Sequence, residues 1–394
     1  MIARDRKTVK FLNELRNKLN SACSFFCAKK DLYSCISKEK WKERIKQCGK
    51  EVVAMNYQIL GKTGLKVSEV GFGGIPIMRL NFKEATRVTR HAFDRGITFF
   101  DTANMYKDSE VKLGKALLGI RDQVVIATKT GRRDAAGALE HLELSLQSLQ
   151  TGYIDLYQFH QVAQEKEWNA IIAPGGAMET VMKAKEQGKV RHIGITSHSL
   201  PMAIKFVQSG LFETIQFPFN FIEEAAKEEL FVEARRYNVG IIVMKPFAGG
   251  IIDRAALAFK YLRQQADILP IPGFDSTEKI DEILAIYQHP NVVSEEDLLL
   301  MDQCRSEVGN QFCRRCEYCQ PCPNGVMITA AMGYGVIAKR MSPAVAVDFA
   351  KTAMETVPNC VDCGVCKPRC PYQLPIPEIL RKHYALYQKH REAQ

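Results

Sequence analysis

Four residues of the sequence could together deliver a proton to a carbonyl oxygen. Asp101, Lys129 and His160 each end an apolar, strand-like run, and Tyr106 lies five residues after Asp101. Tyrosine's ordinary pKa of about 10 makes proton donation difficult at neutral pH, and a neighbouring cation lowers that pKa. We therefore predict Tyr106 as general acid, Lys129 as the cation, Asp101 as the partner that orients Lys129, and His160 as a hydrogen-bond donor to the substrate oxygen.

Each of these four residues also has a purely structural explanation. Asp101 could cap a helix, His160 could be a hydrogen-bonded core residue, Lys129 could extend to solvent, and Tyr106 could be a surface aromatic. Only their occurrence together, at the ends of successive strand-like segments, favours a catalytic site.

A second group of reactive residues is the cysteines near the C-terminus. Two runs occur, each followed by proline: Cys313, Cys316, Cys319 and Cys322, then Cys360, Cys363, Cys366 and Cys370. The second run has the CxxCxxCxxxCP spacing of bacterial ferredoxins, in which the cysteine before proline serves the neighbouring cluster. By that analogy, Cys370 joins the first three thiols of the first run, and Cys322 joins the first three of the second. We predict two [4Fe-4S] clusters; a pair of structural zinc sites is the alternative.

The elements that must position the four polar residues follow an alternating pattern. Eight strand-like segments are predicted at residues 67–72, 97–101, 124–128, 154–160, 192–196, 214–217, 240–244 and 268–271, with helical patterns such as 84–94, 137–149, 178–188 and 225–237 between them. Eight such units predict an α/β fold, a (β/α)8 TIM barrel. A doubly wound sheet is disfavoured because residues 71–77 lack the GxGxxG turn.

Composition suggests three regions: a basic N-terminal extension at 1–54, the barrel at 55–308 and an iron-sulfur domain at 309–394. Residues 1–54 carry 14 Lys and Arg against 6 Asp and Glu, so most of the chain's net charge of +10 lies there. The extension lacks nucleic-acid recognition patterns, so we predict no nucleic-acid partner. Its four cysteines match no metal-site spacing. Patterned sequence begins at Met55, which is a candidate for the native start.

The cysteines and the apolar stretches of the sequence also predict the cellular compartment. Thirteen cysteines without a signal peptide indicate metal binding rather than disulfides, and hence a cytoplasmic protein. No apolar stretch is long enough to span a bilayer, so we expect no membrane partner.

The sequence resembles the aldo-keto reductases over residues 56–290, in the strings LGKTGLKVSEVGFGG, FFDTANMYKDSE, VIATKT, IDLYQFH, GKVRHIGITSHS and LPIPGFDSTEKI. This resemblance implies that Asp101, Tyr106, Lys129 and His160 are a catalytic tetrad. It also implies NADPH or NADH bound across the barrel top, and an aldehyde, ketone or alcohol as substrate. The tail resembles that of a subgroup with a C-terminal ferredoxin-type domain.

The resemblance also implies which residues bind the cofactor. Thr196, Ser197 and Gln216 match positions that hold the nicotinamide carboxamide; Lys245, Pro246, Phe247, Ser276, Lys279 and Glu282 match the phosphate and adenosine region. Two positions depart from the family: Met244 replaces an aromatic residue, and Gly273 replaces a basic one, which leaves Lys279 to favour a 2′-phosphate.

Two other functions remain open. The protein could transfer electrons between nicotinamide and clusters to a ferredoxin-like partner, although hydride carries two electrons and a cluster accepts one. It could also be a nucleotide-sensing subunit, like the potassium-channel β subunits that share this barrel. Trp168, in the loop region 161–176, could line a substrate pocket or pack against the barrel rim.

Overall fold

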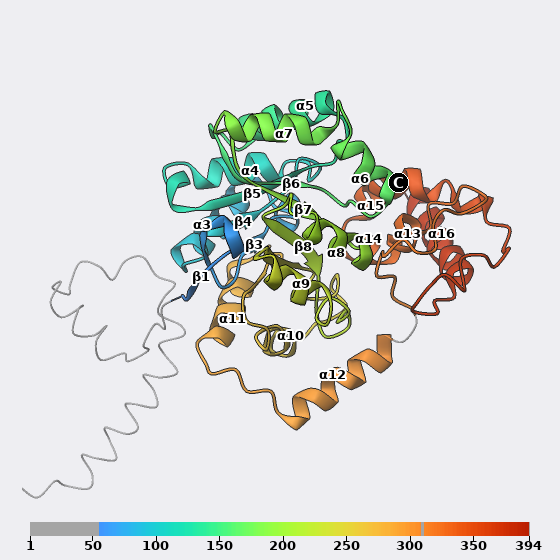
Figure 1. Cartoon of the computed structure of the whole chain (residues 1–394). Coiled ribbons are helices and arrows are strands. Elements are labelled where there is room, and N and C mark those ends of the chain that lie inside the picture. Colours follow the sequence, from blue (N-terminus) through green and yellow to red (C-terminus); the bar gives the residue numbers. More distant parts are fainter. Residues whose placement is uncertain (1–54, 309–310, 394) are drawn as a thin grey trace, which may run out of the picture. The chain divides into compact units, whose positions relative to one another are not determined.

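The computed structural model describes residues 55–308 and 311–393 (Figure 1). The predicted N-terminal extension and its cysteines therefore lie outside the described residues. An eight-stranded parallel sheet is ordered β10-β9-β8-β7-β6-β5-β4-β3. Its strands are β3 (Phe72–Gly73), β4 (Phe99–Asp101), β5 (Val125–Thr130), β6 (Ile154–Phe159), β7 (Val190–Thr196), β8 (Thr214–Pro218), β9 (Gly240–Met244) and β10 (Ile268–Pro270).

Backbone contacts between the first and last strands close the sheet into a barrel. Gly71 N donates to Pro270 O at 2.9 Å, Gly73 N donates to Pro272 O at 2.8 Å, and Gly73 forms a parallel bridge with Gly273. A Cβ at Gly73 would lie 2.8 Å from a carbonyl oxygen of the last strand's extension, so the seam needs glycine here. The predicted (β/α)8 barrel is confirmed.

The first predicted strand, 67–72, is wrong in its extent. Its N-terminal half forms β2 (Lys66–Ser68), which pairs in antiparallel fashion with β1 (Tyr57–Ile59), and only its end enters the barrel as β3. A single apolar run thus contributes to two sheets, because the chain turns at Glu69–Val70, a change that hydrophobic periodicity does not reveal.

Helices cover the outside of the barrel. They are α3 (Phe82–Asp94), α4 (Ser109–Leu117), α5 (Ala135–Ser148), α6 (Glu165–Ile172), α7 (Ala177–Glu186), α8 (Leu200–Gln208), α9 (Leu230–Arg236), α10 (Ala255–Leu262), α11 (Thr277–Tyr287) and α12 (Glu295–Val308). Asn81 begins α3 with a capping box, in which its side chain accepts from Glu84 N at 2.9 Å. The predicted helix at 225–237 starts later than expected, at Leu230.

Two apolar layers follow from the alternation of side chains along each strand. Phe99, Ala127 and Leu156 belong to a cluster inside the barrel, whereas their neighbours Phe100 and Ile126 pack outward beneath the helices. Because the period is two, the residues two positions beyond Phe99, Ala127 and Leu156 also face inward, at the carboxyl end of the barrel.

The tail forms its own core from helices. Its elements are α13 (Ile328–Met332), α14 (Tyr334–Arg340), α15 (Pro343–Met354), η5 (Val357–Asn359) and α16 (Ile376–Glu392). Met332, Tyr334 and Met354 are buried in this core, and several cysteines pack against it. Among residues 311–393 no strand occurs, so the cysteines lie in loops that helices support.

Barrel and tail belong to one compact unit, in which both apolar packing and polar contact join them. Phe312 and Val336 pack with the outer barrel core, and Gln164 Nε2 donates to Glu317 Oε2 at 2.7 Å. The domain boundary at 308/309 therefore stays a prediction.

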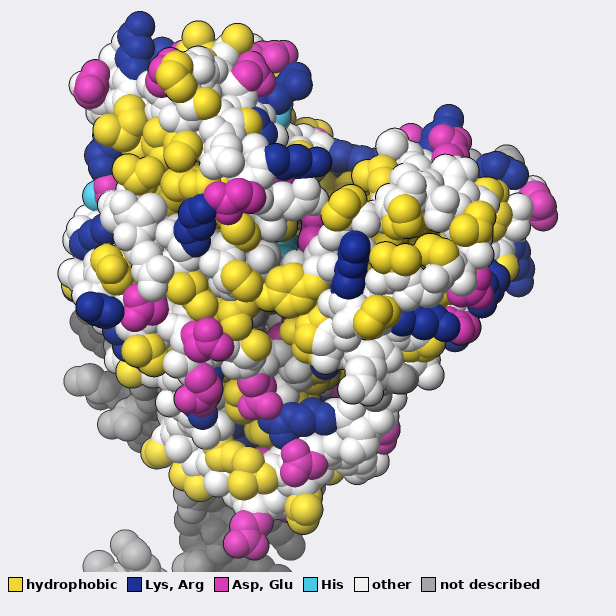
Figure 2. All heavy atoms as spheres, turned by 45° about the vertical axis from the view of Figure 1, so that its right-hand side comes forward, with side chains coloured by type: hydrophobic (Ala, Val, Ile, Leu, Met, Phe, Trp, Pro, Cys, Tyr) yellow, Lys and Arg dark blue, Asp and Glu magenta, His cyan; other side chains and the backbone are white. Residues whose placement is uncertain are grey.

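Surface charge is mixed on the face shown in Figure 2, where Lys and Arg side chains alternate with Asp and Glu. No helix in the described part of the chain is long and apolar enough to cross a membrane.

Candidate functional site

An ion pair lies at the carboxyl end of the barrel interior. Asp101 and Lys129 stand two residues beyond Phe99 and Ala127, so both point inward. Lys129 Nζ donates to Asp101 Oδ1 and to Thr102 O, each at 2.6 Å, and both side chains are almost fully buried. Burial raises the pKa of Asp101 and lowers the pKa of Lys129, while each charge opposes the shift of the other.

Tyr106 and His160 face each other next to this pair. Tyr106 follows β4 in a tight turn, in which its N donates to Ala103 O at 2.9 Å. Its hydroxyl lies 3.4 Å from His160 Nε2, and the two rings meet edge to face. Lys129 Nζ stands 5.3 Å from the centre of the Tyr106 ring. The four residues that the sequence predicts as a site are therefore brought together.

The predicted lowering of the Tyr106 pKa by Lys129 is not seen in this structure. Burial raises the pKa of Tyr106, and the charge of Asp101 raises it further. The Lys129 ammonium donates to Asp101, so the carboxylate balances its charge and Lys129 does not lower the pKa of Tyr106. Burial also lowers the pKa of His160, assisted by the charges of Lys129 and Arg133. Tyr106 and His160 are therefore both neutral near pH 7, and Tyr106 carries its proton.

Sequence reasoning missed Gln158. It lies two residues beyond Leu156 on β6, so it faces inward, and its Nε2 donates to Asp101 Oδ2 at 3.3 Å. The same two-residue spacing that places Lys129 could have identified it. Gln158 fixes the second carboxylate oxygen of Asp101.

The residues predicted to hold the nicotinamide carboxamide lie at the ends of neighbouring strands. The Gln216 side chain hydrogen-bonds Asp101, and within the described residues its buried Oε1 has no partner. Thr196 Oγ1 accepts from Gln161 N at 2.8 Å, and Ser197 Oγ donates to Val162 O at 2.7 Å. An amide donor would satisfy Gln216 Oε1, so this end of the barrel fits a carboxamide.

The residues predicted for the phosphate and adenosine region are more dispersed. Lys245, Pro246 and Phe247 follow β9, and Phe247 packs on Phe259 with ring centres 5.8 Å apart. Ser276 caps α11 through Lys279 N, and Glu282 is exposed on the same helix.

Lys279, the residue expected to favour a 2′-phosphate, pairs with an acid. Its Nζ lies 2.6 Å from Asp275 Oδ1, and both residues are at least partly exposed. Binding a phosphate would require this exposed pair to open, which costs little because surface ion pairs are weak. The role of Lys279 therefore stays a prediction.

Trp168 packs against the barrel instead of lining a pocket. It is 5% exposed on α6, and its ring lies 5.2 Å from that of Phe206 and 5.9 Å from that of Phe212. Of the two roles considered from the sequence, packing is the one that the structure supports.

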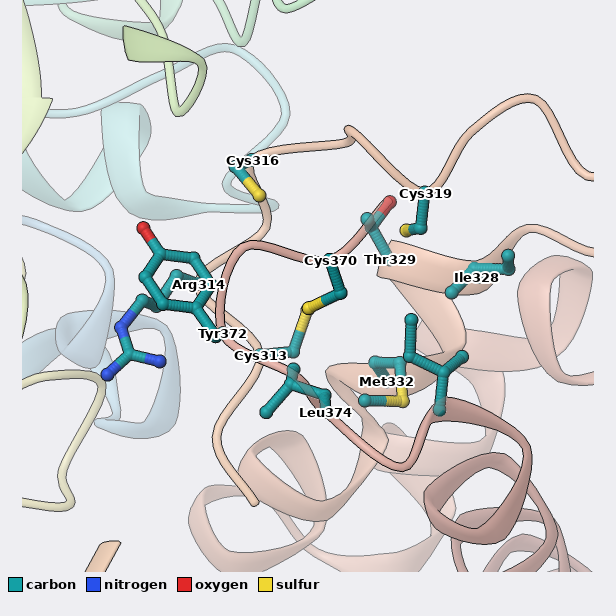
Figure 3. A pocket seen from close by; sticks show the side chains of 11 residues that line it. Cys313, Arg314, Cys316, Cys319, Ile328, Thr329, Met332, Cys370, Tyr372 and Leu374 are labelled. Carbon is teal, nitrogen blue, oxygen red and sulfur yellow. The ribbon is translucent and has the colours of Figure 1, made fainter. Parts of the chain in front are cut away.

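Four cysteines from both runs line one cavity in the tail: Cys313, Cys316, Cys319 and Cys370. Figure 3 shows the sulfur atoms of Cys316 and Cys319 pointing toward each other across this cavity, with Cys370 between them. Burial, together with the charges of Cys313, Cys316 and Cys370, raises the pKa of Cys319 to about 12. A positively charged centre that binds thiolates would relieve this repulsion.

The other four cysteines line a second cavity. They are Cys322, Cys360, Cys363 and Cys366, and Cys319 touches the same space. The grouping is the crosswise one predicted from the ferredoxin spacing, with Cys370 and Cys322 exchanged between the runs. Among the described residues, no three His, Cys, Asp or Glu side chains converge as around a single metal ion. Each set of thiols surrounds a space, and such a set fits an iron-sulfur cluster.

Comparison with protein families identifies both regions. Residues 69–256 match the aldo/keto reductase family, and residues 312–375 match the 4Fe-4S dicluster domain. An uncharacterized oxidoreductase of Bacillus subtilis, YrpG, is 32% identical over 233 residues, covering 52% of this chain and 70% of that protein. The L-galactose dehydrogenase of Arabidopsis thaliana is 31% identical, covering 49% of this chain and 66% of that protein.

Solved structures share the barrel. An aldo-keto reductase from Bacillus halodurans, in its holo form, aligns with a TM-score of 0.55 at 23% identity, covering 64% of this chain and 96% of that one. An aldo-keto reductase from Klebsiella pneumoniae in complex with NADPH aligns with a TM-score of 0.53 at 21% identity, covering 63% of this chain and 94% of that one. From the sequence relatives and the barrel together, this chain belongs to the aldo-keto reductase family, and it carries a 4Fe-4S domain after its barrel.

Proposed function

We propose that the protein reduces an aldehyde or ketone with NADPH or NADH, or catalyses the reverse oxidation, with Tyr106 as proton donor. The observation that carries this proposal is the 3.4 Å approach of Tyr106 Oη to His160 Nε2 beside the buried Asp101–Lys129 pair. A carbonyl oxygen that lies beside these two atoms, at hydrogen-bonding distance from each, would accept hydrogen bonds from both. When bound, the nicotinamide cofactor supplies the hydride.

The residues of the chain then bind and move the proton. His160 polarises the carbonyl oxygen while neutral, and Tyr106 transfers its proton to the oxygen as negative charge develops there. The Lys129 ammonium stabilises the resulting tyrosinate, and Asp101 with Gln158 holds Lys129 in place. Gln216, Thr196 and Ser197 orient the carboxamide of the cofactor. The main support is Gln216 Oε1, which has no hydrogen-bond partner among the described residues.

The cofactor is proposed to be NADPH or NADH, since the ion-paired Lys279 does not decide between them. The Klebsiella neighbour, which is in complex with NADPH, favours NADPH. The tail is proposed to hold two [4Fe-4S] clusters, one on Cys313, Cys316, Cys319 and Cys370, the other on Cys322, Cys360, Cys363 and Cys366.

Substitution of Tyr106 by Phe tests the proposed proton donor. The variant keeps the ring and removes the hydroxyl, so we expect carbonyl reduction to fall by about 10² to 10⁴-fold, the usual range for general acid catalysis. Exposed Tyr57→Phe provides the matched control and should retain wild-type turnover. Equal turnover in the two variants would refute the role of Tyr106 and would favour a nucleotide-sensing protein.

Electron exchange between barrel and tail is a second candidate function, favoured by one contact. Glu317, within the first cysteine run, accepts from Gln164, four residues after His160. Anaerobic addition of NADPH to the cluster-loaded protein, followed by EPR, tests this function. A reduced-cluster signal that appears at the rate of turnover would support it, and an unchanged spectrum from intact clusters would contradict it.

A further inference from the structure

The first cysteine run brings a cation toward the catalytic end of the barrel. Arg315 lies between the cluster ligands Cys313 and Cys316, is half-buried, and has a left-handed backbone with φ of 60°. Its guanidinium fills the space that a side chain at Gly333 would occupy: a Cβ there would lie 2.8 Å from Arg315 Nη2. The guanidinium of Arg315 therefore lies against the junction of α13 and α14.

The loop that carries Arg315 is anchored to the barrel. Glu317, two residues later, accepts from Gln164 Nε2 at 2.7 Å and from Thr329 Oγ1 at 3.1 Å. Gln164 follows His160 in the loop after β6, so the anchor holds the cysteine run close to the catalytic histidine. Phe312 packs with the outer barrel core on the other side of Arg315.

A buried histidine, His198, is affected by the charges of both Arg315 and His160. His198 follows β7 and is 9% exposed, and within the described part of the chain its Nε2 makes no hydrogen bond. Besides burial, the charges of Lys245, Arg315 and His160 lower the pKa of His198. Arg315 and His160 therefore act on the same ring from the tail and from the barrel.

The acidic side chains nearby are already engaged. Asp101 pairs with Lys129, Glu167 pairs with Arg133 at 2.9 Å, and Glu317 accepts from Gln164 and Thr329. Among the ion pairs that the described residues form, none involves Arg315. Arg315 is therefore a half-buried cation without a carboxylate partner in the described part of the chain, and such a group can pair with an incoming anion.

We propose that Arg315 binds an anionic group, a carboxylate or a phosphate, on the carbonyl substrate that Tyr106 and His160 reduce. The inference rests on the proposed function and extends it by naming a substrate class: oxo acids, aldehyde acids or phosphorylated carbonyl compounds. It also gives the cluster loop a role in specificity, since a residue between two cluster ligands would form a wall of the substrate site. Arginine suits this role because its planar guanidinium matches both anions.

A matched pair of aldehydes tests the proposal: 4-carboxybenzaldehyde and its methyl ester, methyl 4-formylbenzoate. The two differ in charge but share the reacting group. In the wild-type protein we expect kcat/KM for the acid to exceed that for the ester. In Arg315→Ala this preference should fall by about 10- to 100-fold, the loss expected for a charge-assisted hydrogen bond. Arg315→Lys should retain part of the preference, and Arg381→Ala, a tail arginine paired with Asp362, should retain all of it.

Equilibrium binding separates this inference from the proposed function. Titration of the NADP⁺-loaded, cluster-loaded protein with each compound measures affinity without turnover, so it remains informative even if neither aldehyde is reduced. Tighter binding of the acid that disappears in Arg315→Ala supports the proposal. Equal loss of affinity for acid and ester, no loss for either, or a loss of NADPH affinity instead would overturn it. Iron content and the visible spectrum of each variant verify that the clusters are intact.

Discussion

The barrel site and the cysteine sites differ in whether their polar groups have partners within the protein. In the barrel, Lys129 and Asp101 neutralise each other, and Gln158 and Thr102 occupy their remaining hydrogen-bonding groups. In the tail, the thiols of the described residues are all free, and burial together with their mutual repulsion raises the pKa of Cys319 to about 12. The charged pair of the barrel thus has its partners within the protein, whereas we expect the thiol sets of the tail to depend on a bound metal centre.

The barrel and the tail also differ in the interactions that stabilise them. The barrel has extensive apolar layers on both faces of its sheet, while the tail packs a smaller helical core against its cysteines. Small domains commonly need a metal centre to remain folded. Loss of the clusters should thus affect the two regions very differently.

Removal of iron should produce the largest effect. We expect anaerobic chelation to unfold the tail around α13 to α16 while the barrel keeps its secondary structure, because only the tail obtains folding energy from the clusters. Hydrogen exchange measured by mass spectrometry would show protection lost after residue 311 and retained in the strands. Equal loss of protection in both regions would contradict the distinction.

If Cys370 and Cys322 are exchanged between the two cysteine runs, pairs of cysteine substitutions should differ in whether their effects on iron content add. Cys370→Ser and Cys313→Ser should each remove one cluster, about half of the roughly eight iron atoms expected for two cubanes. Their combination should remove no more iron than either alone, whereas Cys370→Ser with Cys360→Ser should remove nearly all. The reverse pattern would show that each cysteine run binds its own cluster.

The charged pair of the barrel should be sensitive to loss of one partner. Lys129→Met leaves Asp101 buried without its counter-charge, and we expect the free energy of unfolding to fall by about 3–5 kcal/mol. Adding Asp101→Asn should recover part of that loss, because the uncompensated charge disappears. Chemical denaturation of the cluster-loaded protein measures both changes. A loss that Asp101→Asn deepens would show that the pair is not the cause.

Acidification should lower the stability of the barrel by less than the Lys129→Met substitution does. Burial lowers the pKa of both His160 and His198, so the unfolded chain binds protons that the folded chain does not. Stability is therefore fully present above the unfolded pKa of about 6.5 and falls below it, by up to about 1.4 kcal/mol per pH unit for each histidine. Denaturation curves between pH 7.5 and 5.5 measure the slope. His160→Gln should make the slope shallower, and an unchanged slope would exclude His160 as a source.

The barrel and the proximity of Asp101, Tyr106, Lys129 and His160 could be predicted from the sequence because both depend on local, periodic features. Strand ends converge at one end of a parallel barrel, so Asp101, Lys129 and His160 must lie together wherever eight βα units form. The crosswise thiol sets are similarly encoded by spacing. In each case a short pattern determines a three-dimensional neighbourhood.

Features that depend on contacts between distant segments could not be predicted. Trp168, for example, is placed by Phe206 and Phe212, which come later in the chain. The sequence does not indicate a role for Arg315, because the residue lies within a run of cysteines. Its relevance appears only when Glu317 is seen to bind Gln164.

The most direct test follows the hydride itself. NADPH deuterated at C4 of the nicotinamide, given to the cluster-loaded protein with 4-carboxybenzaldehyde, should yield an alcohol with one deuterium on the former carbonyl carbon, and Tyr106→Phe should slow its formation. Mass spectrometry and NMR of the product measure the label. Consumption of the cofactor with deuterium released to water and no labelled alcohol would contradict carbonyl reduction at the barrel site.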